Sequence, residues 1–260
     1  ATRWTRVSGL LRPLLGRVAL AAPHDAASAE RLAALGLPRA ALGPVAALKS
    51  AVALPEPEAA AVARLGLDRA ETLLAASTHA GEEVQVLDGF LRARARRPAL
   101  RLVLAPRHPE RGPEIARLIA ARGLAHTTRS AGEAPGAAPI HLADTLGEMP
   151  LWYAACAICF VGGSLVPKGG HTPYEPAQFG CALLHGPHVE NAAEAYARLA
   201  RAGAAIEEAD ADALGRAVAG LDAPAQADLG ARARAALAAQ DLAPLLAAMD
   251  ARLRLGAGAA

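Results

Sequence analysis

Two pairs of glycines give residues 160–176 the strongest chemical signal in this 260-residue chain. They lie between an apolar run that ends at Val161 and a helix start near Pro173. Glycine lets the backbone approach a ligand closely, and the free N–H groups of a helix's first turn favour a phosphate. The acidic Glu175 just beyond is suited to accept hydrogen bonds from ribose hydroxyls. The stretch therefore predicts a site for a nucleotide or a nucleotide-sugar. Its expected substrate-binding residues are Gly163, Ser164, Gly170, His171, Thr172 and Glu175.

The same stretch also contains a capping box, which requires no ligand. Thr172 stands three residues before Glu175, and Pro173 occupies the first expected helical position. In this interpretation the carboxylate bonds back to the N–H of Thr172 and stabilises the helix by about 1 kcal/mol at most. A cap does not require the four glycines that precede it, so we favour the ligand role for Glu175.

A second polar segment, residues 77–83, joins a strand end to a helix start through a small loop. Its two acids, Glu82 and Glu83, complement the helix dipole, and a solvated loop would explain the rest. However, this loop follows a strand of the same predicted sheet as the glycine stretch, so its side chains are placed to meet a phosphate or a sugar acid. The substrate-binding residues expected here are Ser77, His79 and Gly81.

Two further strand ends carry polar residues. Arg107 follows an apolar strand directly, and its planar fork of donors suits a phosphate or a carboxylate. Arg111 is expected on the surface of the next helix. Asp144 is a candidate N-cap for a helix that starts at Thr145, and Asn191 is either a cap or a ligand residue.

In order and spacing, five segments resemble the signature motifs of the 3-deoxy-D-manno-octulosonic acid (Kdo) transferases. The glycine stretch resembles the family's GGSL…GGHNPLEP pattern, and the others extend the match over roughly residues 70–205. The segments are Ser77–Glu83, Pro106–Arg111, Asp144–Met149 with Tyr153 after it, Phe160–Pro176, and Gly186–His188 followed by Asn191.

This resemblance implies a two-domain glycosyltransferase of the GT-B type, whose Rossmann-like donor domain would be residues 53–260 including a helical tail. Residues 1–52 would be the last part of the acceptor-binding domain. The family's catalytic base lies earlier in that domain, so no catalytic residue is expected in this chain. The resemblance also implies that Arg107 contacts the cytidine nucleotide and that Gly147, Glu148 and Met149 form a wall around the base.

The implied reaction is an inverting, metal-independent transfer of Kdo from CMP-Kdo to a lipid A precursor in lipopolysaccharide biosynthesis. No cofactor is implied beyond the donor substrate itself. The full-length protein would associate peripherally with the cytoplasmic face of the inner membrane. Alternatives are another GT-B nucleotide-sugar enzyme, such as a UDP-sugar transferase or epimerase, and an inactive CMP-binding module.

The chain departs from the family pattern at two positions. Thr172 stands where the family has asparagine, and Tyr174 stands where it has leucine. Threonine keeps a hydroxyl but loses the paired donor and acceptor of an amide. The nucleotide contact at position 172 is therefore left open.

Charge and cysteine usage exclude several other functions. The 27 basic and 25 acidic residues give a net charge of +2, which is too small for a nucleic-acid footprint. The arginine cluster at 92–97 is expected to be a helix end, with contact to an anionic membrane surface or an acidic substrate as the alternative. Cys156 and Cys159 lie in an apolar run without a second ligand pair, so we expect buried thiols instead of a zinc or redox site. Asp210 and Asp212 have the spacing of a metal pair but lie in the helical tail, and no metal is expected.

The elements that must position these residues follow an alternating pattern. Apolar runs of strand length alternate with amphipathic stretches, as in a parallel sheet covered by helices on both faces. The expected strands are Val18–Ala22, Gly43–Leu48, Thr72–Ala76, Leu100–Ala105, Ile140–Leu142, Ile158–Val161, Ala182–His185 and Ala204–Ile206. The expected helices are Ala26–Leu35, Glu82–Arg97, Glu110–Arg122, Leu146–Ala155, Pro173–Phe179 and Ala192–Ala202, then a tail over about Asp210–Leu255 that is helical except near Pro224 and Pro244.

Two prolines, Pro55 and Pro57, favour an extended linker, and we place the domain boundary there. The chain starts with Ala1 instead of Met, and Ala1–Leu15 shows helical spacing, so we expect a piece of a longer protein. Each motif falls at or just beyond the carboxyl end of an expected strand. Ligands bind at that edge in open α/β sheets.

Overall fold

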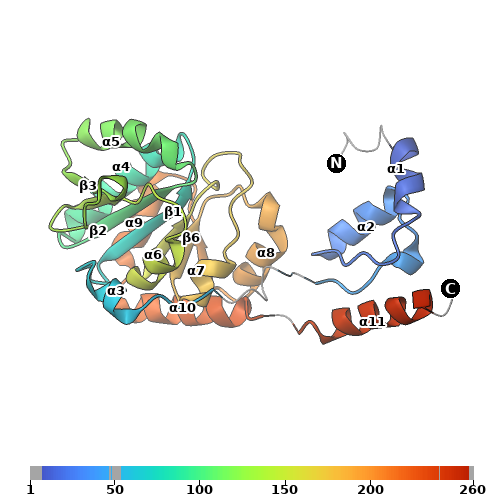
Figure 1. Ribbon diagram of the computed structural model, residues 1–260. Helices are drawn as coiled ribbons and strands as arrows, with labels where there is room; N and C mark the ends of the chain where they lie inside the picture. Colours follow the sequence, from blue (N-terminus) through green and yellow to red (C-terminus); the bar gives the residue numbers. More distant parts are fainter. Residues whose placement is uncertain (1–7, 47, 49–53, 240, 258–260) are drawn as a thin grey trace. The chain divides into compact units, whose positions relative to one another are not determined.

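The computed structural model describes residues 8–46, 48, 54–239 and 241–257. The chain forms two compact units, residues 54–238 and residues 1–53 together with 239–260 (Figure 1). From the sequence we assigned the entire tail to the donor domain, whereas the structure groups its last segment with the N-terminal residues. The functional assignment of the two parts stays a prediction.

The larger unit is built on a parallel sheet, which within the described residues has seven strands in the order β3-β4-β2-β1-β5-β6-β7. The strands are β1 (Thr72–Thr78), β2 (Arg101–Pro106), β3 (His126–Thr128), β4 (Ile140–Leu142), β5 (Ile158–Val161), β6 (Ala182–His185) and β7 (Ala205–Glu207). The sequence prediction missed β3, because its residues are one histidine and two threonines and give no apolar run.

Helices cover both faces of this sheet, as the fold prediction requires (Figure 1). One face packs against α3, α6, α7 and α8, the other against α4, α5 and α9, and α10 contributes to both clusters. The helices are α3 (Ala59–Ala63), α4 (Glu82–Arg96), α5 (Gly112–Ala120), α6 (Met149–Ala155), α7 (Tyr174–Gln178), α8 (Ala193–Arg201), α9 (Ala211–Gly220) and α10 (Ala223–Ala236).

The central strand β1 shows why the sheet needs two helical layers. Leu73 and Ala75 pack into one cluster, while Leu74 and Ala76 pack into the other. Successive side chains of a strand point to opposite faces, so a run that is apolar throughout requires burial on both sides. Each fully buried leucine contributes about 1.5–3 kcal/mol, and this anchors the strand whose end carries the site.

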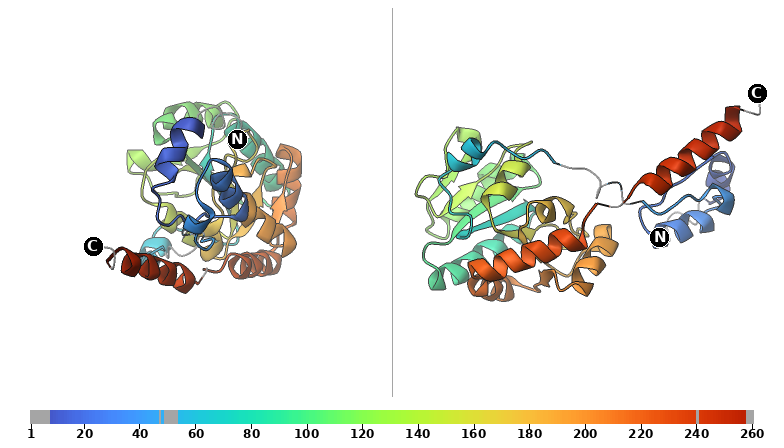
Figure 2. Two further views of the ribbon diagram at one scale, coloured as in Figure 1. Left: turned by 90° about the vertical axis from the view of Figure 1, so that its right-hand side faces the viewer. Right: turned by 90° about the horizontal axis from the view of Figure 1, so that it is seen from below.

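Within its described residues, the smaller unit lacks the two strands that the sequence predicted at Val18–Ala22 and Gly43–Leu48. Its described residues contain an isolated bridge between Ala21 and Leu42, and residues 43–46 have no regular structure. A two-stranded pair without further partners is marginal in water, which explains the failure of both predictions. The unit's helical elements are α1 (Ser8–Leu15), α2 (Ala26–Ala34), the 3-10 turn η2 (Arg39–Ala41) and α11 (Ala243–Ala257), drawn from two directions in Figure 2.

Parts of four expectations lie outside the described residues. They concern the first seven residues of the expected N-terminal helical segment, residue 47 of the expected second strand, residue 53 at the start of the linker, and residue 240 of the expected helical tail. The arginine cluster at the end of α4 is held by the protein itself. Arg97 donates to the carbonyls of Val218 and Leu221 and pairs with Glu71 at 2.9 Å.

None of the helices in the described part of the chain has the length and apolar character needed to cross a bilayer.

The strand order reverses between β1 and β5. From β1 the chain moves outward to β2 on one side, then returns after β4 to pair β5 with the other side of β1. Such a reversal opens a crevice at the carboxyl ends of the two strands, and ligands of open α/β sheets bind there. The loop after β1 and the glycine stretch after β5 both begin at this crevice.

Candidate functional site

The end of β1 has an unusual backbone. Ser77 adopts φ +56°, a left-handed conformation, and the pairing of β1 with β2 shifts between Ala76 and Thr78. Bulges of this kind redirect side chains next to functional sites, and the strain persists only where the surroundings hold it. Thr78 is fully buried, and its hydroxyl has no hydrogen-bond partner among the described residues. Gly81, at φ +94°, then provides the N-cap of α4.

The glycines of the stretch after β5 are required by close approaches within the chain. A Cβ at Gly162 would lie 2.6 Å from the Ser77 carbonyl oxygen, so only glycine lets β5 end against β1. Gly170, at φ +69°, would place a Cβ 2.7 Å from the carbonyl oxygen of His188. Both contacts bring the glycine stretch tightly against its neighbours, independently of any ligand.

Glu82 occupies the position where we expected a phosphate. Its fully buried carboxylate accepts hydrogen bonds from the N–H groups of Gly163 (2.6 Å), Ser164 (2.9 Å) and Leu165 (2.9 Å). It also accepts one from the N–H of His79 at 2.9 Å. The prediction that the amides of Gly163 and Ser164 face a ligand is therefore corrected, because an internal carboxylate takes them.

The Ser164 side chain is likewise engaged within the protein. Its hydroxyl donates to the Val161 carbonyl oxygen at 2.6 Å and accepts from the N–H of Gly186 at 2.8 Å. With Ser164 fully buried, neither its hydroxyl nor its amide is available to a substrate. Its role is to join the ends of β5 and β6.

Three histidines gather beside Glu82. The Nε2 atoms of His79 and His171 are 2.9 Å apart, and the two rings are nearly parallel at 6°. The ring of His108 meets that of His79 edge-on at 5.8 Å. Burial lowers the pKa of His79, the charges of His108 and Lys168 lower it further, and the charges of Glu82 and Glu83 oppose the change. The neutral imidazole of His79 is therefore favoured, and the nearby positive charge of Lys168 suits an anionic ligand.

Glu175 does not form the capping box. Helix α7 begins at Tyr174 with Pro173 at its N-cap, and no side chain bonds to the cap. Burial raises the pKa of Tyr153 well above its ordinary value, and the charge of Glu175 with its hydrogen bond to the tyrosine raises it further. The Thr172 hydroxyl is buried without a hydrogen-bond partner among the described residues. The capping-box interpretation of Glu175 is therefore wrong, its carboxylate bonds to Tyr153, and its role toward a ligand stays a prediction.

Arg107 lies where the sequence predicted, just beyond the end of β2, whereas the prediction of a surface position for Arg111 is wrong. Arg107 is exposed just beyond β2, and its guanidinium makes no hydrogen bond or ion pair with the described residues. Arg111, expected at the surface, lies instead 2.5 Å from the fully buried Glu83 and also pairs with Glu114 at 3.0 Å. Arg107 remains free for an anionic ligand, whereas Arg111 is structural.

The loop after β4 departs from its predicted form. Helix α6 begins at Met149 instead of Leu146, and Asp144 does not cap it. The Asp144 carboxylate accepts from the N–H of Ser130 at 2.9 Å and from its hydroxyl at 2.7 Å. The expected base wall therefore comprises the loop residues Gly147 and Glu148 and the first residue of α6, Met149, and the loop is tied to the segment after β3.

Within that expected wall, the three residues have different surroundings. Glu148 accepts from Arg129 Nε at 3.0 Å, and this bond with the guanidinium's charge lowers the pKa of Glu148. Gly147 is exposed with φ +83°, and Met149 packs against the buried cluster that contains Trp152. The Glu148 side chain is committed to an ion pair, so a contact with a base here would rely on backbone groups.

Asn191 does not cap a helix, and its role toward a ligand stays a prediction. Its side-chain amide donates to the carbonyl of Lys168 at 2.8 Å and to that of Gly170 at 3.4 Å. Its own N–H donates to the Gly169 carbonyl at 2.8 Å. Asn191 therefore holds the second glycine pair in place.

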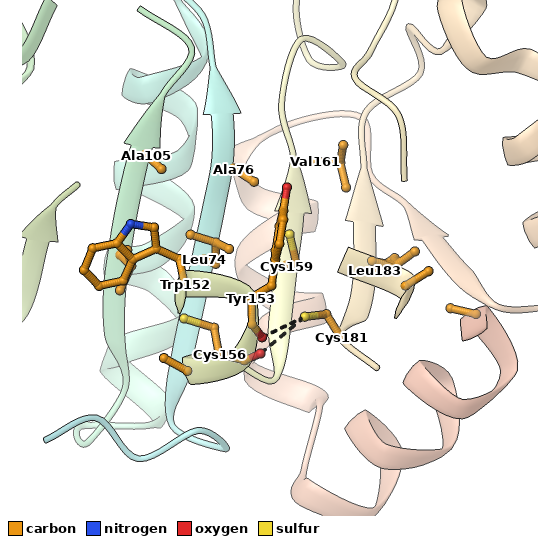
Figure 3. Packing of buried hydrophobic residues seen from close by; sticks show 14 of the residues in the cluster. Leu74, Ala76, Ala105, Trp152, Tyr153, Cys156, Cys159, Val161, Cys181 and Leu183 are labelled. Atoms are coloured by element: carbon orange, nitrogen blue, oxygen red, sulfur yellow. Dashed lines mark hydrogen bonds between the residues drawn. The ribbon is translucent and has the colours of Figure 1, made fainter. Parts of the chain in front are cut away.

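The cysteines are buried thiols, as predicted. Cys156, Cys159 and Cys181 are free and fully buried, and burial raises the pKa of each thiol. Cys181 donates to the carbonyls of Tyr153 and Cys156 at 3.4 Å, as the dashed lines in Figure 3 show. In the part of the chain that the structure describes, no group of three or more His, Cys, Asp or Glu side chains is arranged to hold a metal ion.

The structure brings six of the predicted residues to one place. Ser77, His79, Gly81, Gly163, Gly170 and His171 surround the ends of β1 and β5. Sequence reasoning missed the bonding role of Glu82, because three of its four partners lie more than 80 positions away. The signal available was a pair of adjacent acids at a helix start that follows a small loop, which the helix dipole alone already explained.

A doubly covered parallel sheet with its polar residues at the switch point defines the donor-binding half of a GT-B glycosyltransferase. In the comparison with solved structures, the C-terminal CMP-Kdo binding domain of WaaA from Acinetobacter baumannii is 30% identical with a TM-score of 0.61, covering 98% of that domain and 68% of this chain. The chain belongs to the 3-deoxy-D-manno-octulosonic acid transferase family.

Curated relatives give the same family. The 3-deoxy-D-manno-octulosonic acid transferase of Haemophilus influenzae is 33% identical over 226 residues, which is 85% of this chain and 53% of that protein. The enzyme of that name from Bordetella pertussis is 40% identical over 170 residues, or 63% of this chain and 40% of that protein. The chain thus spans about half the length of the curated relatives it matches. No protein-family model matches it.

A more distant structure shares only the fold. Anabaena Alr3699/HepE in complex with UDP and glucose is 11% identical with a TM-score of 0.58, over 98% of this chain and 67% of that protein. Its likeness supports the GT-B architecture.

Proposed function

We propose that this chain is the donor-binding half of a protein that transfers Kdo from CMP-Kdo to a lipid A precursor in lipopolysaccharide biosynthesis. The observation that carries the proposal is the match over 98% of the CMP-Kdo binding domain of WaaA. The transfer is inverting and needs neither a metal nor a cofactor besides the donor. The base that activates the acceptor hydroxyl belongs to the part of the protein outside this sequence.

In this proposal, each side of the crevice receives one part of the donor. The Glu175 carboxylate, which does not cap its helix, accepts hydrogen bonds from the ribose hydroxyls. Arg107, free of partners in the described structure, donates two parallel bonds to the phosphate and stabilises its charge as CMP departs. Backbone groups of Gly147 and Met149 line the cytosine.

We infer that the complete protein works at the cytoplasmic face of the inner membrane through peripheral association. The acceptor is a lipid, and the described helices cannot cross a bilayer. The membrane contact would come from the acceptor half, as the family resemblance implies.

A transfer assay with the full-length protein tests the proposal. It is incubated with CMP-Kdo and a lipid A precursor, and mass spectrometry follows the acceptor. We expect added mass in units of Kdo, at least tenfold slower transfer by Arg107→Ala, and an unchanged rate for the control Arg117→Ala on the exposed side of α5. Transfer from a UDP-sugar with no use of CMP-Kdo would contradict the proposal.

A further inference from the structure

Glu82 is a buried carboxylate that has no cationic partner among the described residues. It is fully buried at the N-terminus of α4, yet no arginine, lysine or histidine forms an ion pair with it in the described structure. Its neighbour Glu83 is equally buried but lies 2.5 Å from Arg111. Burying an unpaired charge is costly unless hydrogen bonds replace the lost water. For Glu82 four backbone N–H groups make that replacement.

The amides that bind Glu82 have the arrangement of an anion-binding loop. Three consecutive N–H groups, from Gly163 to Leu165, point at its two oxygens from 2.6–2.9 Å, and Gly163 has the left-handed φ of +71°. Successive amides in a turn that includes a left-handed residue form a concave nest, which commonly receives a phosphate. Here the nest is filled from within by the carboxylate.

We propose that Glu82 is a built-in anion and a positioning residue of the donor site. Its carboxylate holds the glycine loop against the loop after β1 and so positions His79 next to His171. The donor's anionic group then binds beside these two histidines, because the loop amides are already occupied by Glu82. The inference rests on the proposed function for the identity of the donor. It adds that Glu82 sets the shape of the site, and that the donor's anionic group must approach from the side of His79 and His171.

The surroundings of His79 fit this arrangement. One Glu82 oxygen bonds both the N–H of His79 and the N–H of Gly163, so the two loops share a single anchor. Gly163 in turn lies against both imidazoles, since a Cβ there would be 3.3 Å from His171 and 3.4 Å from His79. Displacing the anchor therefore moves the two rings relative to each other.

Chemical rescue with formate tests the built-in anion. Glu82→Ala leaves a cavity lined by four N–H donors, and formate carries the deleted carboxylate. We expect Glu82→Ala to melt at a lower temperature and to bind CMP at least tenfold more weakly, with formate restoring both. Glu82→Gln fills the same volume but offers one oxygen in place of two, so it should be weakened in CMP binding and should not respond to formate. Asp88→Ala, on an outer position of the same helix, controls for general effects of formate.

Each result decides the inference. Wild-type affinity for CMP in a folded Glu82→Gln or Glu82→Ala would overturn the positioning role. An equal rise of the melting temperature in wild type and Glu82→Ala would overturn the built-in anion. Folding of Glu82→Ala only in the presence of formate would support the inference. Failure of Glu82→Ala to fold even with formate, together with normal CMP binding by Glu82→Gln, would overturn the inference. Because the melting temperatures need no nucleotide, failure of wild type to bind CMP would reject the proposed function separately.

Discussion

Thr172 carries a hydroxyl that the described protein leaves unsatisfied. A buried hydroxyl without a partner costs about 1–3 kcal/mol, so native structures retain few of them. This one lies between His171, which contacts His79, and the helix start that presents Glu175. A ligand group that bonds the hydroxyl would recover the cost, and threonine would then serve where the family has asparagine.

Replacing Thr172 with valine separates the two effects of the hydroxyl. We expect Thr172→Val to unfold with unchanged or slightly higher free energy, because the unsatisfied oxygen is removed and the shape is kept. CMP affinity should fall about five- to tenfold, which corresponds to one lost hydrogen bond. Isothermal titration and urea unfolding measure the two quantities.

The matched control is Thr72→Val. The Thr72 hydroxyl donates to the Asp68 carbonyl at 2.6 Å, at the far end of β1 from the site. This variant should lose stability and keep its CMP affinity. Unchanged CMP affinity in Thr172→Val would show that the hydroxyl does not meet the nucleotide.

At the scale of elements, the site depends on how α4 is tied to the segment after β2. Glu83 in the first turn of α4 pairs with Arg111, next to the short 3-10 turn at Pro109–Arg111. Removing one partner of a buried pair leaves the other charge buried and unpaired, which typically costs 3–5 kcal/mol. The pair therefore fixes the position of the loop that carries Arg107.

We expect Arg111→Met to lower the free energy of unfolding by about 3 kcal/mol. Urea denaturation followed by circular dichroism measures this change. Arg201→Met is the control, since Arg201 lies exposed on α8 and its pair with Glu194 is at the surface. A loss below about 1 kcal/mol for Arg111→Met would mean that water solvates Glu83 and that the pair does not hold the loop.

The strands, the helix boundaries and the long-range contacts differ in how well the sequence predicts them. The strands from Thr72 onward, apart from the polar β3 (His126–Thr128), were predictable because apolar runs identify them, and Arg107 and Glu175 followed as the polar residues beyond strand ends. The start of α6 was not, because Asp144 bonds to Ser130 in a segment 14 positions earlier. Glu82 was missed for the same reason at larger separation. Local patterns do not reveal a hydrogen bond whose partner is fixed only by the sheet topology.

At the scale of the whole molecule, buried histidines couple stability to pH. Burial, helped by the charge of Arg129, lowers the pKa of His141 to about 4 from the ordinary 6.5, and burial also lowers the pKa of His185. Between pH 6.5 and about pH 4, His141 is protonated in the unfolded chain but not in the folded chain. The free energy of unfolding therefore decreases as the pH falls through this range. The contribution of His141 over that range is about 3 kcal/mol.

The variant His141→Asn tests this coupling. We expect it to be less stable than wild type at pH 7, because the packing against Trp152 is lost. Its stability should then fall by about 2 kcal/mol less than that of wild type between pH 6.5 and pH 5. Urea unfolding at several pH values gives the two slopes. Identical slopes would show that folding does not lower the pKa of His141.

The central claim is that this chain recognises a cytidine nucleotide at the switch point of its sheet. Calorimetric titration with CMP, with UMP as the control ligand and Glu175→Ala alongside, tests it most directly. The account predicts binding of CMP, much weaker binding of UMP, and loss of CMP binding in Glu175→Ala without loss of fold. Equal binding of CMP and UMP, or undiminished CMP binding in Glu175→Ala, would contradict it.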